Sequence, residues 1–165
     1  MKTSGNYSAS NVEQAILRLK DVMINDGKPI EAVRILDQAG IRMVFVECKN
    51  SCIDAVCTWL DEQTPVIGMT LRFDRIDNFW FVLRHELAHV QQGYADCLPV
   101  DCDLGKKAIH KLEDEANAIA QEFCAPAKLV ERFLLGCNGR ITESTVAKYA
   151  KENKINPAVL AGQIR

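Results

Sequence analysis

The sequence is organised around residues 79–90, which read FWFVLRHELAHV. Apolar side chains recur every three or four positions here, as on a helix that packs one face against a core. On such a helix His85 and His89 lie on the same side, about one turn apart, where two imidazoles can bind one metal ion. Glu86 completes the pattern His-Glu-x-x-His, in which the glutamate acts as a general base beside zinc.

The position of Glu86 argues against a chance match to this short motif. Glu86 falls inside the apolar stripe of the predicted helix, whose other members are Phe79, Val82, Leu83 and Val90. A carboxylate on a buried stripe is unfavourable unless it is paired or lies near a metal ion. A helix with a purely structural role gives no reason for this placement, so we interpret the motif as a metal site.

Composition restricts the class of protein. The chain has 165 residues, of which 48% are hydrophobic and 25% charged, which suits one compact domain with a sizeable core. The net charge of −2 argues against direct nucleic-acid binding, and no apolar run is long enough to span a membrane. We expect residues 1–10, which lack the apolar segment of a signal peptide, to be a disordered tail, and residues 11–165 to form a single cytoplasmic domain.

The seven cysteines match no common metal or redox motif. No two of them are separated by two residues, which excludes the zinc-ribbon and thioredoxin patterns. Reduced and mostly buried thiols are therefore expected. Cys97 and Cys102, close behind the motif, are the pair best placed for a redox or metal role, but the reduced state remains the favoured interpretation.

The hydrophobic pattern predicts an α+β fold, in which a small antiparallel three-stranded sheet packs on a helical body that carries the motif helix. Strands are expected at residues 41–48, 53–60 and 66–71, the last two forming a hairpin. Asn78 is expected to cap the motif helix and Gly93 to end it, before a long loop at residues 94–105. The other helices are predicted to begin near Ser10 or Asn11 and at Pro29, and to span residues 106–124, 127–135, 142–151 and 157–164.

A catalytic zinc ion usually has three protein ligands, so a third must come from elsewhere in the chain. The candidates are His110 and the acidic cluster Glu113, Asp114 and Glu115 on the next predicted helix. Glu113 and Glu115 are about 200° apart and flank the apolar stripe from different sides, so periodicity does not choose between them. Asp114 points furthest from the stripe. Without the motif, we would interpret the cluster as solvent-exposed acidic residues near the N-terminus of a helix, where the helix dipole stabilises negative charge.

The two predicted helices together resemble the ImmA/IrrE metallopeptidase family. The resemblance is carried by His-Glu-Leu-Ala-His at 85–89 and Glu-Asp-Glu-Ala-Asn-Ala-Ile-Ala at 113–120, followed by Pro126. The family's later motif is Glu-x-Glu-Ala-Asn-x-Phe-Ala, so Ile119 replaces its phenylalanine. The resemblance extends over about residues 30–133.

That resemblance implies a zinc-dependent peptidase of the HExxH…E type. It implies Zn²⁺ bound by His85, His89 and Glu115, with Glu86 as the catalytic base. Asn117 is a candidate for supporting a ligand from outside the metal's own shell. Attack on a peptide carbonyl forms a tetrahedral oxyanion, which needs a hydrogen-bond donor. The candidates for that donor, by residue type only, are His110, Tyr94 and Arg72.

The expected partner is a protein, since members of this family cleave, or are thought to cleave, helix-turn-helix repressors. Residues 141–165, however, resemble the tail of HigA-type antitoxins. A second hypothesis is therefore a non-catalytic sensing or interaction domain of a transcriptional regulator or antitoxin. A metal-dependent hydrolase with another substrate is a third hypothesis.

Overall fold

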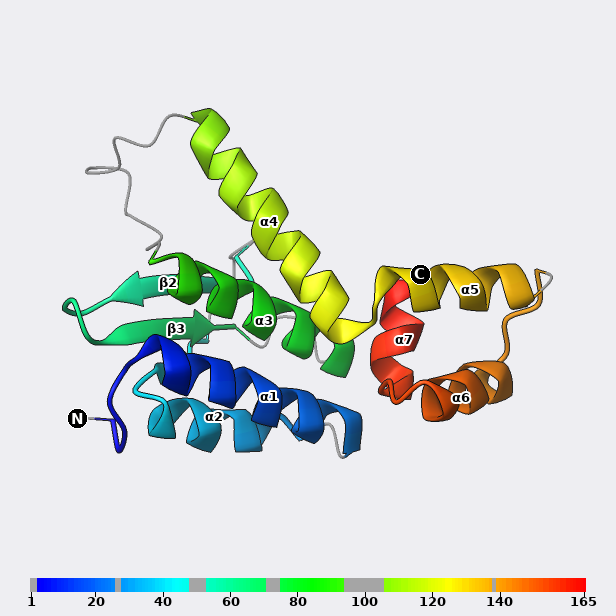
Figure 1. Ribbon diagram of the computed structural model, residues 1–165, viewed down its shortest axis with the longest axis horizontal. Helices are drawn as coiled ribbons and strands as arrows, with labels where there is room; N and C mark the ends of the chain where they lie inside the picture. The colour runs from blue at the N-terminus through cyan, green and yellow to red at the C-terminus, as the bar shows by residue number, and fades with distance from the viewer. Residues whose placement is uncertain (1–2, 26–27, 48–52, 71–74, 94–105, 138) are drawn as a thin grey trace.

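The computed structural model describes residues 3–25, 28–47, 53–70, 75–93, 106–137 and 139–165, with the backbone alone at 106–109. Figure 1 shows the α+β arrangement that the hydrophobic pattern predicts. Within the described ranges, the elements in chain order are α1 (Ala9–Asn25), α2 (Pro29–Gln38), β1 (Arg42–Phe45), β2 (Ala55–Trp59), β3 (Pro65–Met69), α3 (Ile76–Gln92), α4 (Lys106–Cys124), α5 (Ala127–Gly136), α6 (Glu143–Glu152) and α7 (Pro157–Gln163). None of the described helices has both the length and the apolar character needed to cross a membrane.

The sheet is mixed, which corrects the prediction of an antiparallel sheet. β2 and β3 form the predicted antiparallel hairpin, but β1 pairs with β3 in parallel, in the order β1-β3-β2. All five residues of β3 are buried, and this apolar strand lies at the centre of the sheet. The next strand after β1 in the chain, β2, therefore lies at the opposite edge, and β3 pairs between the two. Hydrophobic pattern indicates which face of a strand is buried but not its direction, which explains the error.

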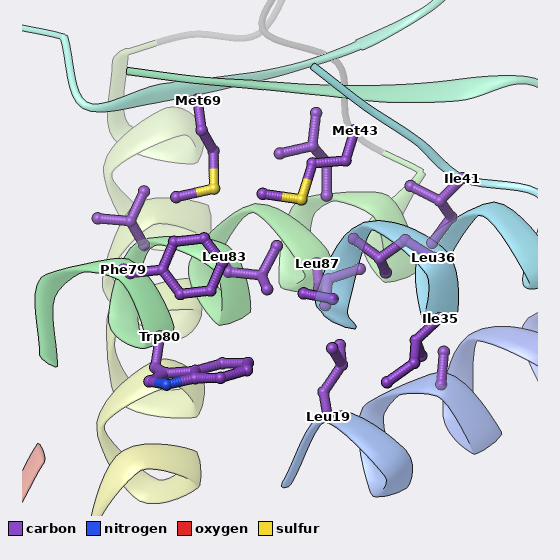
Figure 2. Packing of buried hydrophobic residues seen from close by; sticks show 14 of the residues in the cluster. Leu19, Ile35, Leu36, Ile41, Met43, Met69, Phe79, Trp80, Leu83 and Leu87 are labelled. Carbon is purple, nitrogen blue, oxygen red and sulfur yellow. The ribbon is translucent and has the colours of Figure 1, made fainter. Parts of the chain in front are cut away.

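Helix α3 lies at the centre of the main core, between the sheet on one side and α1 and α2 on the other. Figure 2 shows Met43 of β1 and Met69 of β3 pointing toward α3, while Leu19 of α1 approaches it from the opposite side and Leu36 of α2 lies beside Leu87. Ten of the 17 residues of α3 are buried, and Trp80 is fully enclosed. Because α3 is buried around most of its circumference, core packing determines the position of the helix that carries the motif.

Both ends of α3 are defined by short-range interactions. Gly93 ends the helix in the left-handed conformation, with φ of 66°, and its N–H bonds to the carbonyls of His89 and Val90. This confirms the predicted stop, since glycine adopts positive φ without strain. The predicted start at Asn78 is wrong by one turn. The helix begins at Ile76, and the acidic Asp77 in its first turn is favoured by the helix dipole.

Helix α4 crosses α3 in direct contact (Figure 1). The residues of α4 at the contact are small, and Ala116, Ala120 and Cys124 are fully buried. At the far end of α4, the Lys20 ammonium of α1 donates a hydrogen bond to the Phe123 carbonyl and lies 5.0 Å from the centre of the Phe123 ring. Lysine at this end also complements the negative pole of the helix dipole. Close packing and a cation together fix where α4 lies.

The last three helices form a small core of their own beside the end of α3. Its buried residues are Ala125, Val130, Phe133, Val146, Ala150, Ile155 and Leu160. Asn156 caps α7 through the N–H groups of Ala158 and Val159, and its side-chain amide donates to the Met23 carbonyl of α1 at 2.7 Å. Gly162 of α7 lies so close to α3 that a Cβ there would be 2.1 Å from a carboxylate oxygen of Asp77. Through these contacts the C-terminal helices pack against α1 and α3.

Part of the expected N-terminal tail packs on the body. The Ser4 hydroxyl donates to Asp37 of α2 at 2.5 Å, and the ring of Tyr7 meets Trp59 of β2 edge to face, with centroids 5.1 Å apart. Residues 3–8 therefore lie against α2 and β2 rather than apart from them.

Several predictions fall outside the described residues. They concern Cys48, Cys52, Cys97 and Cys102, the loop at 94–105, and the oxyanion candidates Arg72 and Tyr94. Among the other cysteines, Cys57 and Cys124 are buried and Cys137 is half-buried, which agrees with the prediction of mostly buried thiols.

The small residues of α4 give a test of this packing. Ala120→Leu should lower the free energy of unfolding by about 1–3 kcal/mol, because extra methylene groups in a closely packed contact force α3 and α4 apart. Urea denaturation of the metal-free protein measures the effect.

Ala118→Leu is the matched control, since Ala118 lies on the exposed side of the same helix. Its unfolding free energy should change by less than about 0.5 kcal/mol. Equal effects at positions 118 and 120 would contradict the close α3–α4 contact.

Candidate metal centre

Three side chains from two helices converge on one point. His85 and His89 of α3 have their Nε2 atoms 3.0 Å apart. The carboxylate of Glu113 on α4 approaches both, with Oε2 3.2 Å from His85 Nε2 and Oε1 3.3 Å from His89 Nε2. Each residue offers one ligand atom, and these atoms lie within 4.8 Å of one another. Two imidazoles and one carboxylate in this arrangement could hold a metal ion.

The two histidines converge as their spacing predicts, but the acidic partner is not the one expected. The structure places Glu113 beside the histidines. Glu115, the third ligand implied by the family resemblance, instead lies 3.7 Å from Lys111 on an exposed face of α4. Its side chain is 47% exposed. The structure thus brings together His85, His89 and Glu113 and does not bring Glu115 to them.

The geometry of α4 explains why Glu113 is the residue that faces α3. At about 100° per residue, the buried Ala116, Ala120 and Cys124 all lie within about 60° of Glu113 around the helix axis. Glu115 lies about 200° away from Glu113 and so points in nearly the opposite direction. The line of small residues that contacts α3 therefore carries Glu113 at its N-terminal end.

The motif glutamate is buried, as its place in the apolar stripe predicts. Glu86 is 5% exposed, and the other members of the stripe, Phe79, Val82, Leu83 and Val90, are buried as well. Glu86 is thus held in the interior directly beside His85 in sequence. A carboxylate in this position needs an interaction that offsets its loss of hydration.

Exposure falls from one side of the group to the other. The His89 side chain is 1% exposed, that of His85 is 15% and that of Glu113 is 37%. His89 is therefore fixed by the core, whereas Glu113 reaches solvent. Among the three side chains, that of Glu113 is the most accessible to solvent.

A fourth polar side chain contacts the group. The Nδ1 atom of His85 lies 3.0 Å from Oδ1 of Asn117, which is one turn after Glu113 on α4. The sequence analysis names Asn117 as a candidate for supporting a ligand, and in the structure its amide oxygen lies beside His85. His110, a candidate third ligand and oxyanion donor, is exposed on α4. It is not part of the group within 4.8 Å.

A buried cation precedes His85 on α3. The Arg84 side chain donates to Gln91 at 2.9 Å, and its guanidinium carbon lies 6.0 Å from the centre of the Phe123 ring. Burial lowers the pKa of Arg84 to about 10, so the side chain stays charged at neutral pH. Burial also raises the pKa of the neighbouring Cys124 thiol to about 12, which keeps it protonated and unreactive. Neither residue was singled out by the sequence pattern.

Comparison with known proteins adds no family assignment. No protein-family model matches the chain, and no curated protein matches it. The resemblance of the two motifs to ImmA/IrrE peptidases therefore stays a prediction.

Two variants on α4 test which acid completes the group. Glu113→Gln should weaken Zn²⁺ binding by more than about 100-fold, because even residues that only support a ligand contribute about 10–100-fold. Glu115→Gln, the matched control with the same loss of charge two residues away, should bind as the unmodified protein does. Competition with a chromogenic chelator measures both affinities. A larger loss for Glu115→Gln than for Glu113→Gln would favour the ligand implied by the family resemblance.

Proposed function

We propose that this protein is a zinc-dependent peptidase. The observation that carries the proposal is the convergence of His85, His89 and Glu113, with the buried Glu86 inside the same motif. Two neutral imidazoles and a carboxylate form a common ligand set for catalytic zinc, and three protein ligands leave one position open. The choice of Zn²⁺ over other metals rests on this donor set.

The separations of the ligand atoms suit this metal. Bonds of about 2.0–2.1 Å in a tetrahedral arrangement hold neighbouring ligand atoms about 3.3–3.4 Å apart. The three separations in the structure are 3.0, 3.2 and 3.3 Å. The side chains are therefore within a few tenths of an ångström of the spacing that one tetrahedral ion requires.

Each residue has a defined part in this proposal. A zinc ion held by His85, His89 and Glu113 would acidify a water molecule, so that this water could lose a proton near neutral pH and act as a nucleophile. Glu86 accepts the proton of the attacking water and passes it to the leaving amine. His85, His89 and Glu113 hold the ion and must be deprotonated to do so, so metal binding weakens as the pH falls.

The proposed substrate is a regulatory protein, such as a helix-turn-helix repressor. This part rests on the motif resemblance alone, since residues 85–89 and 113–120 are similar to those of ImmA/IrrE peptidases. The exposed Glu113 side of the group is compatible with approach of a protein chain from solvent.

Substitution of the base separates binding from catalysis. Glu86→Gln should retain about one zinc ion per chain but cleave a co-expressed repressor from a neighbouring gene at least about 100-fold more slowly, because general-base catalysis contributes about 10²–10⁴-fold. Elemental analysis gives the zinc content, and electrophoresis of the repressor gives the rate.

The outcomes of this experiment differ in meaning. If the Glu86→Gln variant cleaved the repressor at an unchanged rate, Glu86 would not be the general base. Zinc binding without cleavage by the unmodified protein would favour the non-catalytic interaction domain. Absence of zinc after reconstitution would refute the metal centre itself.

A further inference from the structure

We infer that Asn117 is a positioning residue of the metal centre, which fixes the tautomer and ring orientation of His85. The inference rests on the proposed metal-binding function and adds to it a residue outside the ligand set. The juxtaposition that carries it is the 3.0 Å contact between Asn117 Oδ1 and His85 Nδ1.

The direction of this hydrogen bond follows from the chemistry of the two groups. A side-chain amide oxygen can only accept a hydrogen bond, so Nδ1 of His85 carries the proton and donates it. A neutral imidazole has one proton, which leaves the lone pair on Nε2. This is the atom that lies 3.0 Å from His89 Nε2 and 3.2 Å from Glu113 Oε2. The contact with Asn117 therefore leaves His85 ready to bind a metal at the point where the three ligands meet.

His85 has a greater need for such support than His89. The core encloses His89, whose side chain is 1% exposed, so packing already restricts its ring. The ring of His85 is 15% exposed and lies toward the open side of the group. A hydrogen bond to its outer nitrogen restricts the rotation that packing does not.

The same helix supplies both the third ligand and the support. Asn117 follows Glu113 by four residues, so the two side chains lie about 40° apart around α4. The buried Ala116 and Ala120 beside them hold this face of α4 against α3. The contact between α3 and α4 thus brings Glu113 close to Nε2 of His85 and Asn117 close to Nδ1 of the same ring.

Metal affinity is the first measurement. Removing the partner of a ligating histidine typically weakens metal binding by about 10–100-fold. Asn117→Ala and Asn117→Leu should both show this loss in a Zn²⁺ titration against a chromogenic chelator. Asn117→Asp should restore the affinity, because a carboxylate also accepts from Nδ1–H. The Co²⁺ absorption spectrum should change in the Ala and Leu variants and resemble that of the unmodified protein in the Asp variant.

Matched controls on α4 separate positioning from other effects. Gln121 is exposed one turn after Asn117, so Gln121→Ala removes an amide without touching His85. Gln121→Glu adds the same charge as Asn117→Asp at that neighbouring position. Neither control should change zinc affinity by more than about twofold, since neither alters a partner of a ligand.

A readout in the metal-free protein is independent of zinc. Nitrogen-15 NMR of the histidine rings above their titration range should show the His85 proton on Nδ1 in the unmodified protein and in Asn117→Asp. In Asn117→Leu, the proton should shift toward Nε2. Urea denaturation should show all variants folded, and a merely structural role of Asn117 would change stability without changing the tautomer.

Two results would overturn the inference. One is zinc affinity in Asn117→Leu equal to that of the unmodified protein. The other is a His85 proton on Nε2 in the unmodified metal-free protein. If the unmodified protein bound no zinc but showed the Nδ1–H tautomer, the proposed metal-dependent function would fail, and with it the positioning of a ligand, while the Asn117 hydrogen bond itself would stand.

Discussion

The close contact between α3 and α4 is the constraint on which the candidate metal centre depends. Two of the candidate ligands belong to α3 and the third to α4, so no single element contains the group that could hold a metal ion. Ala116 and Ala120 permit this contact, because their methyl side chains let the two helices approach. The free energy of the contact comes from many weak dispersion interactions rather than one strong bond. The position of Glu113 is therefore a property of helix packing.

A second set of contacts holds the other end of α4. Lys20 of α1 donates to the Phe123 carbonyl, and the buried guanidinium of Arg84 lies near the Phe123 ring. Burial lowers the pKa of both cations, which shows that their charges are poorly hydrated. The negative pole of the α4 dipole and the aromatic ring offset part of that loss. Residues from the first helix of the chain thus help to orient the helix that carries Glu113.

The sequence pattern correctly predicted those features that depend on neighbouring residues in the chain. The spacing of His85 and His89, the burial of Glu86 and the end of α3 at Gly93 each depend on residues within one or two turns. The choice between Glu113 and Glu115 depends instead on which face of α4 meets α3. Large apolar residues dominate a periodicity analysis, and they suggested a stripe with an acid on either side. In the structure, the larger Leu112, Ile119 and Phe123 are only half-buried, and the contact follows the alanines. The direction of β1 was missed for a related reason, because strand direction is set by the path of the chain and not by alternation.

The register of α4 along α3 then decides which side chains the histidines meet. A shift of one residue would rotate α4 by about 100° and carry Glu113 away from the histidine nitrogens. Such a shift would also bury Asn117 or a charged neighbour among apolar groups, which is unfavourable without a partner. The alanine contact, the cations at Phe123 and the hydrogen bond from His85 to Asn117 all favour the same register. These interactions lie at different points along α4. A shift of α4 that relieved one of them would therefore break the other two. The whole length of α4 thus determines the site, even though Glu113 alone, among the α4 side chains that the structure describes, belongs to the group that could hold a metal ion.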